Sequence, residues 1–344
     1  MFTHIVKANN GNIACRELSL LGKIIKNGGL VAFPTETVYG LGANALDDEA
    51  VKKIYTAKGR PSDNPLIVHF ADACDIAMAV REIPDSAKLL FSRFSPGPLT
   101  VIMKKSEALA QTVTAGLDTV AVRIPSDKTA RAFIKAAGVP IAAPSANISG
   151  KPSPTTAGHV IEDMNGKIDA IIDGGDCEVG VESTIIDLSG DLPVILRPGG
   201  ITFNQIKELL PNVVIDSHVL SCVTVDDKPK CPGMKYKHYA PEADVTVVEG
   251  ELTAVRRKIA ELIKENNGEK IGVLAYDGAE YRTALVIYSG ADNRTFAKNL
   301  FRELREFDEK GIKTVYAEFV YDEDYGLAVK NRLYKSAGNK VIYV

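Results

Sequence analysis

Short apolar runs alternate along the chain with segments whose apolar residues recur every three or four positions. A short apolar run predicts a buried strand, and the wider spacing predicts a helix with one apolar face. In the first part of the chain, strands are predicted at residues 30–33, 66–70, 99–103, 120–124, 139–143, 170–173, 183–188 and 194–196. Helices are predicted at residues 16–27, 47–57 and 203–210.

Alternating strands and helices are typical of the α/β class. Many of the connections are longer and richer in Gly and Pro than a regular strand–helix–strand alternation requires. The pattern therefore predicts a strongly twisted, mixed sheet rather than a regular doubly wound one.

The periodicity weakens over residues 216–243, which contain Asp226-Asp227, Pro229, Pro232-Gly233 and Pro241. This composition is typical of a linker. The alternation then resumes, with strands predicted at residues 244–248, 270–275, 284–289, 314–319 and the C-terminus, and helices at 252–264, 295–309 and 327–336. We therefore predict an N-terminal domain over residues 1–212, a linker over residues 213–243 and a small Rossmann-like α/β domain over residues 244–344.

Composition places the chain among ordinary globular proteins, with 45% hydrophobic and 25% charged residues in 344. The net charge of −3 argues against bulk electrostatic binding to nucleic acid or to an anionic membrane, although it permits a local basic groove. No apolar run approaches the roughly 20 residues of a membrane-spanning helix. Because Met1–Asn12 also lacks the pattern of a signal peptide, we expect a cytoplasmic protein.

The cysteines are widely spaced and form no CxxC pair and no Cys/His zinc cluster. Reduced thiols are the usual state of such residues in a reducing compartment. We therefore expect no disulfide framework among Cys15, Cys74, Cys177, Cys222 and Cys231.

Two polar blocks carry the clearest chemical signal. Lys58-Gly59-Arg60-Pro61 places two cations around a glycine, and Ser145-Ala146-Asn147 follows a predicted buried strand. Lys and Arg donors suit phosphate oxygens, and a glycine lets the backbone approach a ligand closely. Hydroxyl and amide groups at the end of a strand suit a small polar ligand. Together they indicate a nucleotide site.

The two commonest nucleotide-binding motifs have no support in this sequence. Neither GxxxxGK[ST] nor GxGxxG occurs at a predicted strand-to-helix junction. Gly150-Lys151-Pro152-Ser153 resembles the end of a phosphate-binding loop only superficially, because Pro152 and Pro154 disfavour a helix at that point.

Two polar residues lie inside predicted strands. Arg123 has apolar neighbours, and a buried guanidinium needs a partner. An internal ion pair and recognition of a ligand carboxylate both account for it. His69 is placed similarly, either as a hydrogen-bonded core histidine, which is the commoner case, or as a ligand contact.

Further polar blocks follow other strands: residues 34–42, with Thr35, Glu36 and Thr37, residues 180–184 and residues 197–200. Each block alone is equally well explained by turn chemistry or by a ligand-facing loop. Their repetition after strand upon strand favours loops that converge on one pocket.

Four blocks together resemble the YrdC-type threonylcarbamoyl-AMP synthase family. They are Pro34-Thr35-Glu36-Thr37-Val38-Tyr39-Gly40-Leu41, Lys58-Gly59-Arg60-Pro61, Pro144-Ser145-Ala146-Asn147 and Arg197-Pro198-Gly199. The resemblance spans the first domain, and the rest of the chain resembles the longer, two-domain branch of the family. It implies a YrdC-like catalytic domain with a central pocket.

The resemblance also implies a nucleotidyltransferase reaction. L-threonine, bicarbonate and ATP give L-threonylcarbamoyladenylate and pyrophosphate, with Mg²⁺ accompanying ATP. A downstream tRNA threonylcarbamoyl transferase machinery then modifies adenosine 37 of tRNAs that read ANN codons, so weak direct contact with tRNA is also an expectation.

Residue roles follow from the same resemblance. The signature tetrad around the nucleotide and the intermediate is Lys58, Arg60, Ser145 and Asn147. The threonine contacts are Thr37, His69, Arg123 and Ser183, and the further ATP contacts are Asn64, Thr119, Ser153, Arg197 and Tyr236. No metal ligands are assigned. The aromatic, basic segment around Tyr236 and His238 is expected to act as a lid on the active site.

Two other functions remain open at this point. An RNA-binding module without adenylate-forming activity would hold tRNA or double-stranded RNA in the cationic pocket, but it predicts a broadly basic surface, which a pI of about 6.0 disfavours. A carbamoyl-phosphate-dependent transferase of hydrogenase maturation would need acylphosphatase-like and zinc-finger segments, and the chain has neither.

Overall fold

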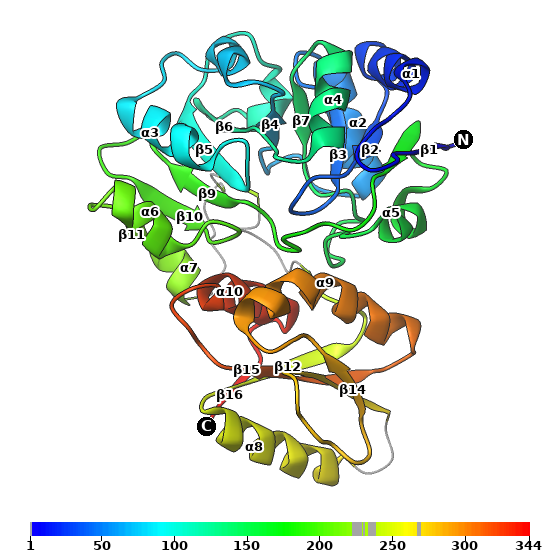
Figure 1. Ribbon diagram of the computed structural model, residues 1–344, viewed down its shortest axis with the longest axis vertical. Helices are drawn as coiled ribbons and strands as arrows, with labels where there is room; N and C mark the ends of the chain where they lie inside the picture. Colours follow the sequence, from blue (N-terminus) through cyan, green and yellow to red (C-terminus); the bar gives the residue numbers. More distant parts are fainter. Residues whose placement is uncertain (1, 222–228, 230, 233–238, 267–269) are drawn as a thin grey trace. The chain divides into compact units, whose positions relative to one another are not determined.

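A mixed sheet of eleven strands organises the first of two units into which the described residues divide (Figure 1). The computed structural model describes residues 2–221, 229, 231–232, 239–266 and 270–344. The first unit includes residues 2–149, 153–219 and 231–232, and the second includes residues 150–152, 239–266 and 270–344. No described helix is long and apolar enough to cross a membrane.

The eleven strands pair in both directions. Their spatial order is β1 (His4–Lys7), β8 (Ala170–Asp173), β2 (Val31–Phe33), β3 (Gly40–Asn44), β7 (Ile141–Ala143), β4 (Ile67–His69), β6 (Thr119–Arg123), β5 (Leu99–Lys104), β9 (Thr184–Asp187), β10 (Val194–Arg197) and β11 (Val214–Ile215). β4 and β6 are parallel, whereas β4 and β7, and β5 and β6, are antiparallel. The predicted mixed sheet is confirmed.

Helices cover the two faces of this sheet unequally. They are α1 (Cys15–Lys26), α2 (Asp48–Lys58), α3 (Asp85–Phe94), α4 (Lys128–Ala137), α5 (Ala157–Met164), α6 (Phe203–Leu209) and α7 (Ser217–Ser221), with 3₁₀ turns at Ala73–Met78 and Gln111–Thr114. α1 and α4 lie side by side (Figure 1) and share one hydrophobic core with β1, β2, β7 and β8. α2, α3, α5 and α6 contribute to the core on the opposite face.

The face that carries α1 and α4 continues over β4, β6, β5 and β9 as a separate small apolar cluster. It contains Ile67, Ala121, Ile102, Ile185, Leu196 and Cys231. Its strand residues alternate along their strands with residues of the opposite core. The described helices of the first unit do not contribute to this cluster. The predicted site residues His69, Thr119 and Arg123 lie on this face of the sheet, because Val68, Val120 and Val122 between them belong to the opposite core.

Several elements were not predicted. β1, β3, α3, α4 and α5 are missing from the sequence prediction. The segment 34–42 was interpreted as a loop, but Gly40 begins β3, which pairs with β2 and β7. Its sequence, Gly-Leu-Gly-Ala-Asn, contains no β-branched residue, so only pairing with its neighbours makes it a strand. β11 and α7 fall within the predicted linker, and β11 pairs with β10.

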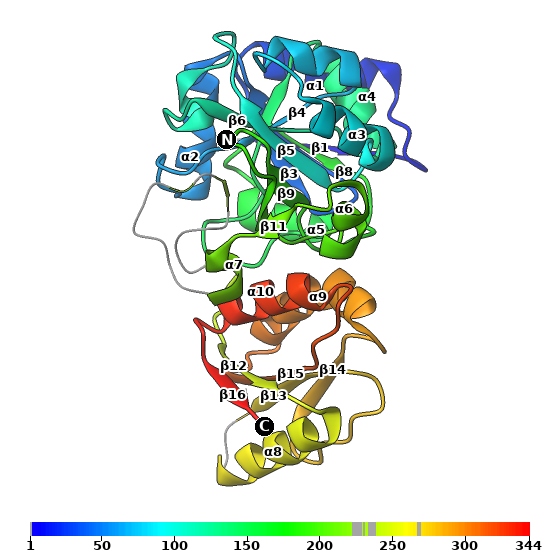
Figure 2. The ribbon, with the colours of Figure 1, turned by 90° about the vertical axis from the view of Figure 1, so that its left-hand side faces the viewer.

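The second unit contains a five-stranded sheet in the order β14 (Leu285–Tyr288), β13 (Ile271–Ala275), β15 (Thr314–Phe319), β12 (Asp244–Glu249) and β16 (Val341–Tyr343). Every described pairing in it is parallel. α8 (Leu252–Glu265) lies on one face, and α9 (Asn293–Glu309) and α10 (Gly326–Ser336) lie on the other (Figures 1 and 2). The predicted Rossmann-like α/β unit is confirmed.

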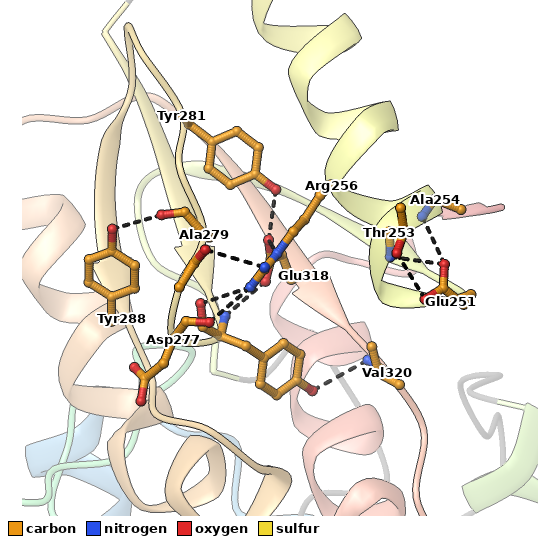
Figure 3. Close-up of polar contacts among 12 residues, drawn as sticks. Glu251, Thr253, Ala254, Arg256, Asp277, Ala279, Tyr281, Tyr288, Glu318 and Val320 are labelled. Atoms are coloured by element: carbon orange, nitrogen blue, oxygen red, sulfur yellow. Dashed lines mark hydrogen bonds and ion pairs between the residues drawn. The ribbon is translucent and has the colours of Figure 1, made fainter.

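An ion pair ties α8 to β15, and further hydrogen bonds tie α8 to the loop after β13 (Figure 3). Arg256 Nε donates to Glu318 Oε1 at 3.1 Å, and Glu318 also accepts from the Tyr276 backbone N–H and the Tyr281 hydroxyl. The guanidinium donates further to the Asp277 carbonyl oxygen at 3.0 Å. Because the Glu318 carboxylate is fully buried, these bonds compensate its loss of hydration.

Candidate functional site

Polar side chains from neighbouring strands meet at one end of β4 and β6. His69 ends β4 and Arg123 ends β6, and the two are paired directly in the parallel ladder. Thr100 of β5 is paired with Arg123 on its other side. The Thr100 hydroxyl lies 2.7 Å from the hydroxyl of Ser183, which directly precedes β9. Adjacent strands thus bring together three of the four residues that the resemblance assigns to threonine.

Thr37, the fourth of these residues, lies in the loop between β2 and β3. Its side chain is fully buried, and its hydroxyl lies 2.9 Å from that of Thr35. Thr35 in turn donates to the Val38 carbonyl oxygen at 2.6 Å. The hydroxyl pair therefore stiffens the loop from within.

The residues assigned to ATP lie mostly at the opposite end of the same strands. Thr119 begins β6, Asn64 precedes β4, and Ser145 follows the antiparallel strand β7. Four residue steps of about 3.3 Å separate Thr119 from Arg123, or about 13 Å. The polar residues therefore form two sets, one at each end of the central strands.

Lys58 connects α2 to the loop after β7. Its ammonium group donates to the Ser145 and Asn147 carbonyl oxygens at 2.5 and 2.6 Å. The Ser145 hydroxyl donates to Asn147 Oδ1 at 2.5 Å, and the Ser149 backbone N–H donates to the Lys58 carbonyl oxygen at 2.9 Å. Three members of the predicted tetrad, Lys58, Ser145 and Asn147, thus form one hydrogen-bonded cluster.

Arg60, the fourth member, lies just beyond the C-terminus of α2. Gly59 ends the helix in the left-handed conformation, with φ 61°. The Arg60 guanidinium lies 5.8 Å from the centre of the Tyr55 ring and donates to the Asn64 carbonyl oxygen at 3.3 Å. These contacts bring Arg60 to the same loop as Asn64.

The Asn64 side chain carries the strongest local sign of a ligand. It is 1% exposed, yet neither its amide nitrogen nor its amide oxygen has a hydrogen-bond partner among the described residues. A buried amide without a partner is costly, so a group from outside the described chain is expected to complete it. This observation supports the ATP contact predicted for Asn64.

Arg123 makes the internal ion pair that was one of its two interpretations. Its Nη2 lies 2.8 Å from Glu36 Oε1, and both side chains are 5% exposed. Its Nε donates to the Gly97 carbonyl oxygen at 3.4 Å. The guanidinium Nη1 has no partner among the described residues, so a ligand carboxylate remains compatible with the pair.

His69 is buried and neutral. Burial, reinforced by the positive charge of Arg123, lowers the pKa of His69 to about 3. Its Nδ1 lies 3.2 Å from the Ile67 carbonyl oxygen, and its ring packs edge-on against Phe33 with centroids 5.9 Å apart. His69 thus has the contacts of a core histidine while lying beside Arg123.

We expect His69→Gln to reduce the loss of stability that accompanies acidification. Below pH 6.5 an unfolded histidine binds a proton, whereas native His69 stays neutral down to about pH 3. Between these values the unfolded state binds more protons, so the His69 contribution to stability falls as the pH falls. Urea unfolding at pH 7 and pH 4.5 measures the difference for each variant.

His4→Gln is the matched control, because the His4 imidazole is partly exposed and pairs with Glu17. This variant should lose as much stability as the wild type between the two pH values. A His69→Gln protein that loses the same amount would contradict the assignment of the acid effect to His69.

The segment 180–184 and β10 link the two polar sets. Arg197 Nη2 donates to the Ser183 hydroxyl at 3.1 Å and to its carbonyl oxygen at 3.0 Å. The Ser153 hydroxyl donates to Glu182 Oε1 at 2.7 Å. Two residues assigned to ATP, Arg197 and Ser153, therefore contact the segment that carries Ser183.

Two described residues of the predicted linker, Cys231 and Pro232, lie on this face of the sheet. Cys231 is buried in the apolar cluster over β4, β6, β5 and β9, and the Pro232 carbonyl oxygen accepts from Arg197 Nη1 at 3.4 Å. Tyr236 and His238, predicted as an ATP contact and as part of a lid, lie outside the described residues.

Sequence reasoning missed three polar residues of the site: Glu36, Thr100 and Glu182. All three are buried. Glu36 and Glu182 were noted within polar blocks but received no role, although a buried Arg123 requires a counter-charge. Thr100 had no signal in the sequence, because a threonine within a strand is ordinary.

Two protein-family models match consecutive parts of this chain. A family model for Sua5, YciO and YrdC, described as telomere recombination, matches residues 23–199. A second model, described as the C-terminal domain of threonylcarbamoyl-AMP synthase, matches residues 201–338.

Curated relatives and a solved structure match at nearly full length. A threonylcarbamoyl-AMP synthase from Pyrococcus abyssi is 50% identical over 95% of this chain and 96% of its own, and one from Bacillus subtilis is 46% identical over 95% and 94%. The crystal structure of P. abyssi Sua5 complexed with L-threonine has a TM-score of 0.94 at 48% identity and covers all of both chains. The chain therefore belongs to the Sua5/YciO/YrdC family, in the branch that also carries the C-terminal domain of threonylcarbamoyl-AMP synthases.

Proposed function

We propose that this protein is a threonylcarbamoyl-AMP synthase, which forms L-threonylcarbamoyladenylate and pyrophosphate from L-threonine, bicarbonate and ATP. The observation that carries the proposal is the pair of polar sets at the two ends of β4 and β6. His69 and Arg123 suit an amino acid at one end, and Asn64 and the cluster around Lys58 suit a nucleotide at the other. The names of the curated relatives and the threonine complex of P. abyssi Sua5 support it.

The reaction needs alignment rather than a protein nucleophile. The threonine amine and bicarbonate form a carbamate with loss of water, a carbamate oxygen attacks the α-phosphorus of ATP, and the bond to pyrophosphate breaks. Two anions must be held in line, and the growing negative charge must be stabilised. A carbamate reverts to amine and carbon dioxide, so a site that excludes water favours the forward reaction.

The chain's own residues meet these needs from two sides. Arg60 and Arg197 supply cationic donors for phosphate oxygens, and Lys58 adds charge while it holds Ser145 and Asn147. Arg123 supplies the donor for the threonine carboxylate, and Thr37 and Ser183 are the hydroxyls that distinguish threonine from apolar amino acids. His69, being neutral, adds no charge that would compete with Arg123.

Mg²⁺ is proposed to enter with ATP and to neutralise phosphate charge. Among the described residues, no group of three or more His, Cys, Asp or Glu side chains is placed to hold a metal ion. A magnesium ion bound mainly by phosphates and water needs no such group of side chains, so this mode of binding is compatible with the described residues.

The product is proposed to serve a downstream tRNA threonylcarbamoyl transferase machinery that modifies adenosine 37 of tRNAs reading ANN codons. A cytoplasmic location and weak direct contact with tRNA belong to the same proposal. Closure of the linker over the site would protect the adenylate from hydrolysis, and the burial of Cys231 on the site face supports this role.

Pyrophosphate release from ATP is expected to depend on both L-threonine and bicarbonate. The physical reason is that attack on the α-phosphorus requires a carbamate, which needs both precursors. Release is measured with each omitted in turn, after dissolved carbon dioxide has been removed from the buffer. Release that continues at an unchanged rate without either one would refute the synthase proposal.

A further inference from the structure

The Arg123 guanidinium is fixed from two directions. Its Nε donates to the Gly97 carbonyl oxygen, and its Nη2 donates to Glu36 at 2.8 Å. Both contacts leave Nη1 without a partner among the described residues. A guanidinium held in this way presents one free edge, and such an edge suits a carboxylate.

The Glu36 carboxylate is itself held in place. Its second oxygen, Oε2, accepts from the Ser126 backbone N–H at 3.1 Å, and its backbone carbonyl accepts from the Val179 N–H at 2.8 Å. Turning this side chain away from Arg123 would break both carboxylate bonds in a buried place. The orientation of Arg123 is therefore determined by Glu36.

Glu36 is connected to the amino-acid end of the site through both of its neighbours. It precedes Thr37 in the chain, and its ion-pair partner Arg123 is paired with His69 in the sheet. We infer that Glu36 is a positioning residue for substrate recognition, which keeps Arg123 aligned so that its free edge meets the carboxylate of the amino acid. This inference rests on the proposed function, and it assigns Glu36 a role that its burial alone does not require.

The Arg123 guanidinium would contact two carboxylates, that of Glu36 and that of the ligand. In the empty site, the Glu36 charge compensates the buried Arg123 cation. When threonine binds, its own ammonium group accompanies its carboxylate, so the bound site holds two cations and two anions. The pair thus suits a zwitterionic amino acid better than a ligand that carries no carboxylate.

A purely structural ion pair and a positioning pair predict different ligand preferences. A structural pair affects the binding of all ligands through the stability of the fold. A positioning pair affects only ligands with a carboxylate, so L-threoninol, in which an alcohol replaces that group, is the discriminating probe. Binding of L-threonine and of L-threoninol to the full-length protein is measured by calorimetry.

Glu36→Gln is expected to weaken L-threonine binding by tenfold or more and L-threoninol binding by less than twofold. The amide keeps the shape of the side chain but removes its charge and one acceptor. In an Arg123→Ala background, the same change should alter L-threonine binding by less than twofold, because Glu36 acts through Arg123. Glu36→Asp keeps the charge on a shorter side chain. If Glu36→Gln does not fold, the binding of L-threonine and of L-threoninol is compared in Glu36→Asp instead.

Glu318→Gln is the matched control, since it removes the buried partner of Arg256 in the second unit (Figure 3). It should lower the melting temperature without changing L-threonine binding. The inference is overturned if Glu36→Gln binds L-threonine within twofold of the wild type, or if both ligands weaken equally. A wild-type protein that does not bind L-threonine would refute the proposed function and the inference together.

Discussion

Lys58→Ala is expected to lower the rate of adenylate formation by at least tenfold at saturating substrate, which corresponds to about 1.4 kcal/mol in the activation barrier. The change removes a buried cation from the nucleotide end of the site. It also leaves the Ser145 and Asn147 carbonyl oxygens without the donor that now holds them at 2.5 and 2.6 Å. Both effects act on the alignment of ATP, so the loss should appear mainly in kcat.

Lys52→Ala on the same helix provides the control for this change. Lys52 is exposed and pairs with Glu49 in a surface ion pair at 2.6 Å, and such pairs contribute little. Pyrophosphate release and thermal unfolding are measured for both variants. A Lys58→Ala protein that folds and turns over within twofold of the wild type would exclude Lys58 from the mechanism.

Arg123→Ala is expected to raise the KM for L-threonine by roughly 100-fold, because a hydrogen bond to a charged group contributes about 1.5–3 kcal/mol. The KM for ATP should change much less, since Asn64, Thr119 and Ser145 lie at the other end of the central strands. The variant also leaves the Glu36 charge buried and unpaired, which is expected to lower the free energy of unfolding by about 3–5 kcal/mol.

Because Arg123→Ala is destabilising, Arg123→Lys is measured as a second variant that keeps a charge beside Glu36. Lysine keeps the positive charge but lacks the forked donor set, so threonine recognition should still weaken. Arg131→Ala removes a partly exposed arginine that pairs with Asp72 at 2.9 Å, and it should leave both KM values unchanged. If the Arg123 variants have an unchanged KM for L-threonine and bind ATP more weakly, Arg123 is a nucleotide contact and not a threonine contact.

The local elements of the second unit were predicted well because short-range patterns define them. The strand predicted at residues 314–319 is β15 itself, and the helix predicted at residues 327–336 is α10 less its first residue. The start of α2 near residue 47 has the same local origin, since the Asp47 carboxylate accepts from the Glu49 and Ala50 backbone N–H groups and caps the helix. Caps, apolar periodicity and glycine stops are all read from neighbouring residues.

The strands that were not predicted depend on long-range pairing rather than on a local pattern. β3 contains no β-branched or aromatic residue and becomes a strand only because β2 and β7 flank it. The two edge strands β1 and β11 likewise each have a single neighbour in the sheet. Strand formation at such places depends on partners that are distant in sequence, and no local pattern reports them.

The amino-acid sequence by itself determined the α/β class, the polar blocks and the family that those blocks resemble. These features depend on residue type and on spacing along the chain. Only the tertiary structure decided that His69 and Arg123 lie side by side, that Thr100 and Ser183 lie next to them, and that Glu36 is the partner of Arg123. Strand order, register and burial bring these groups together over long sequence separations, and a buried charge selects its partner only once the sheet has formed.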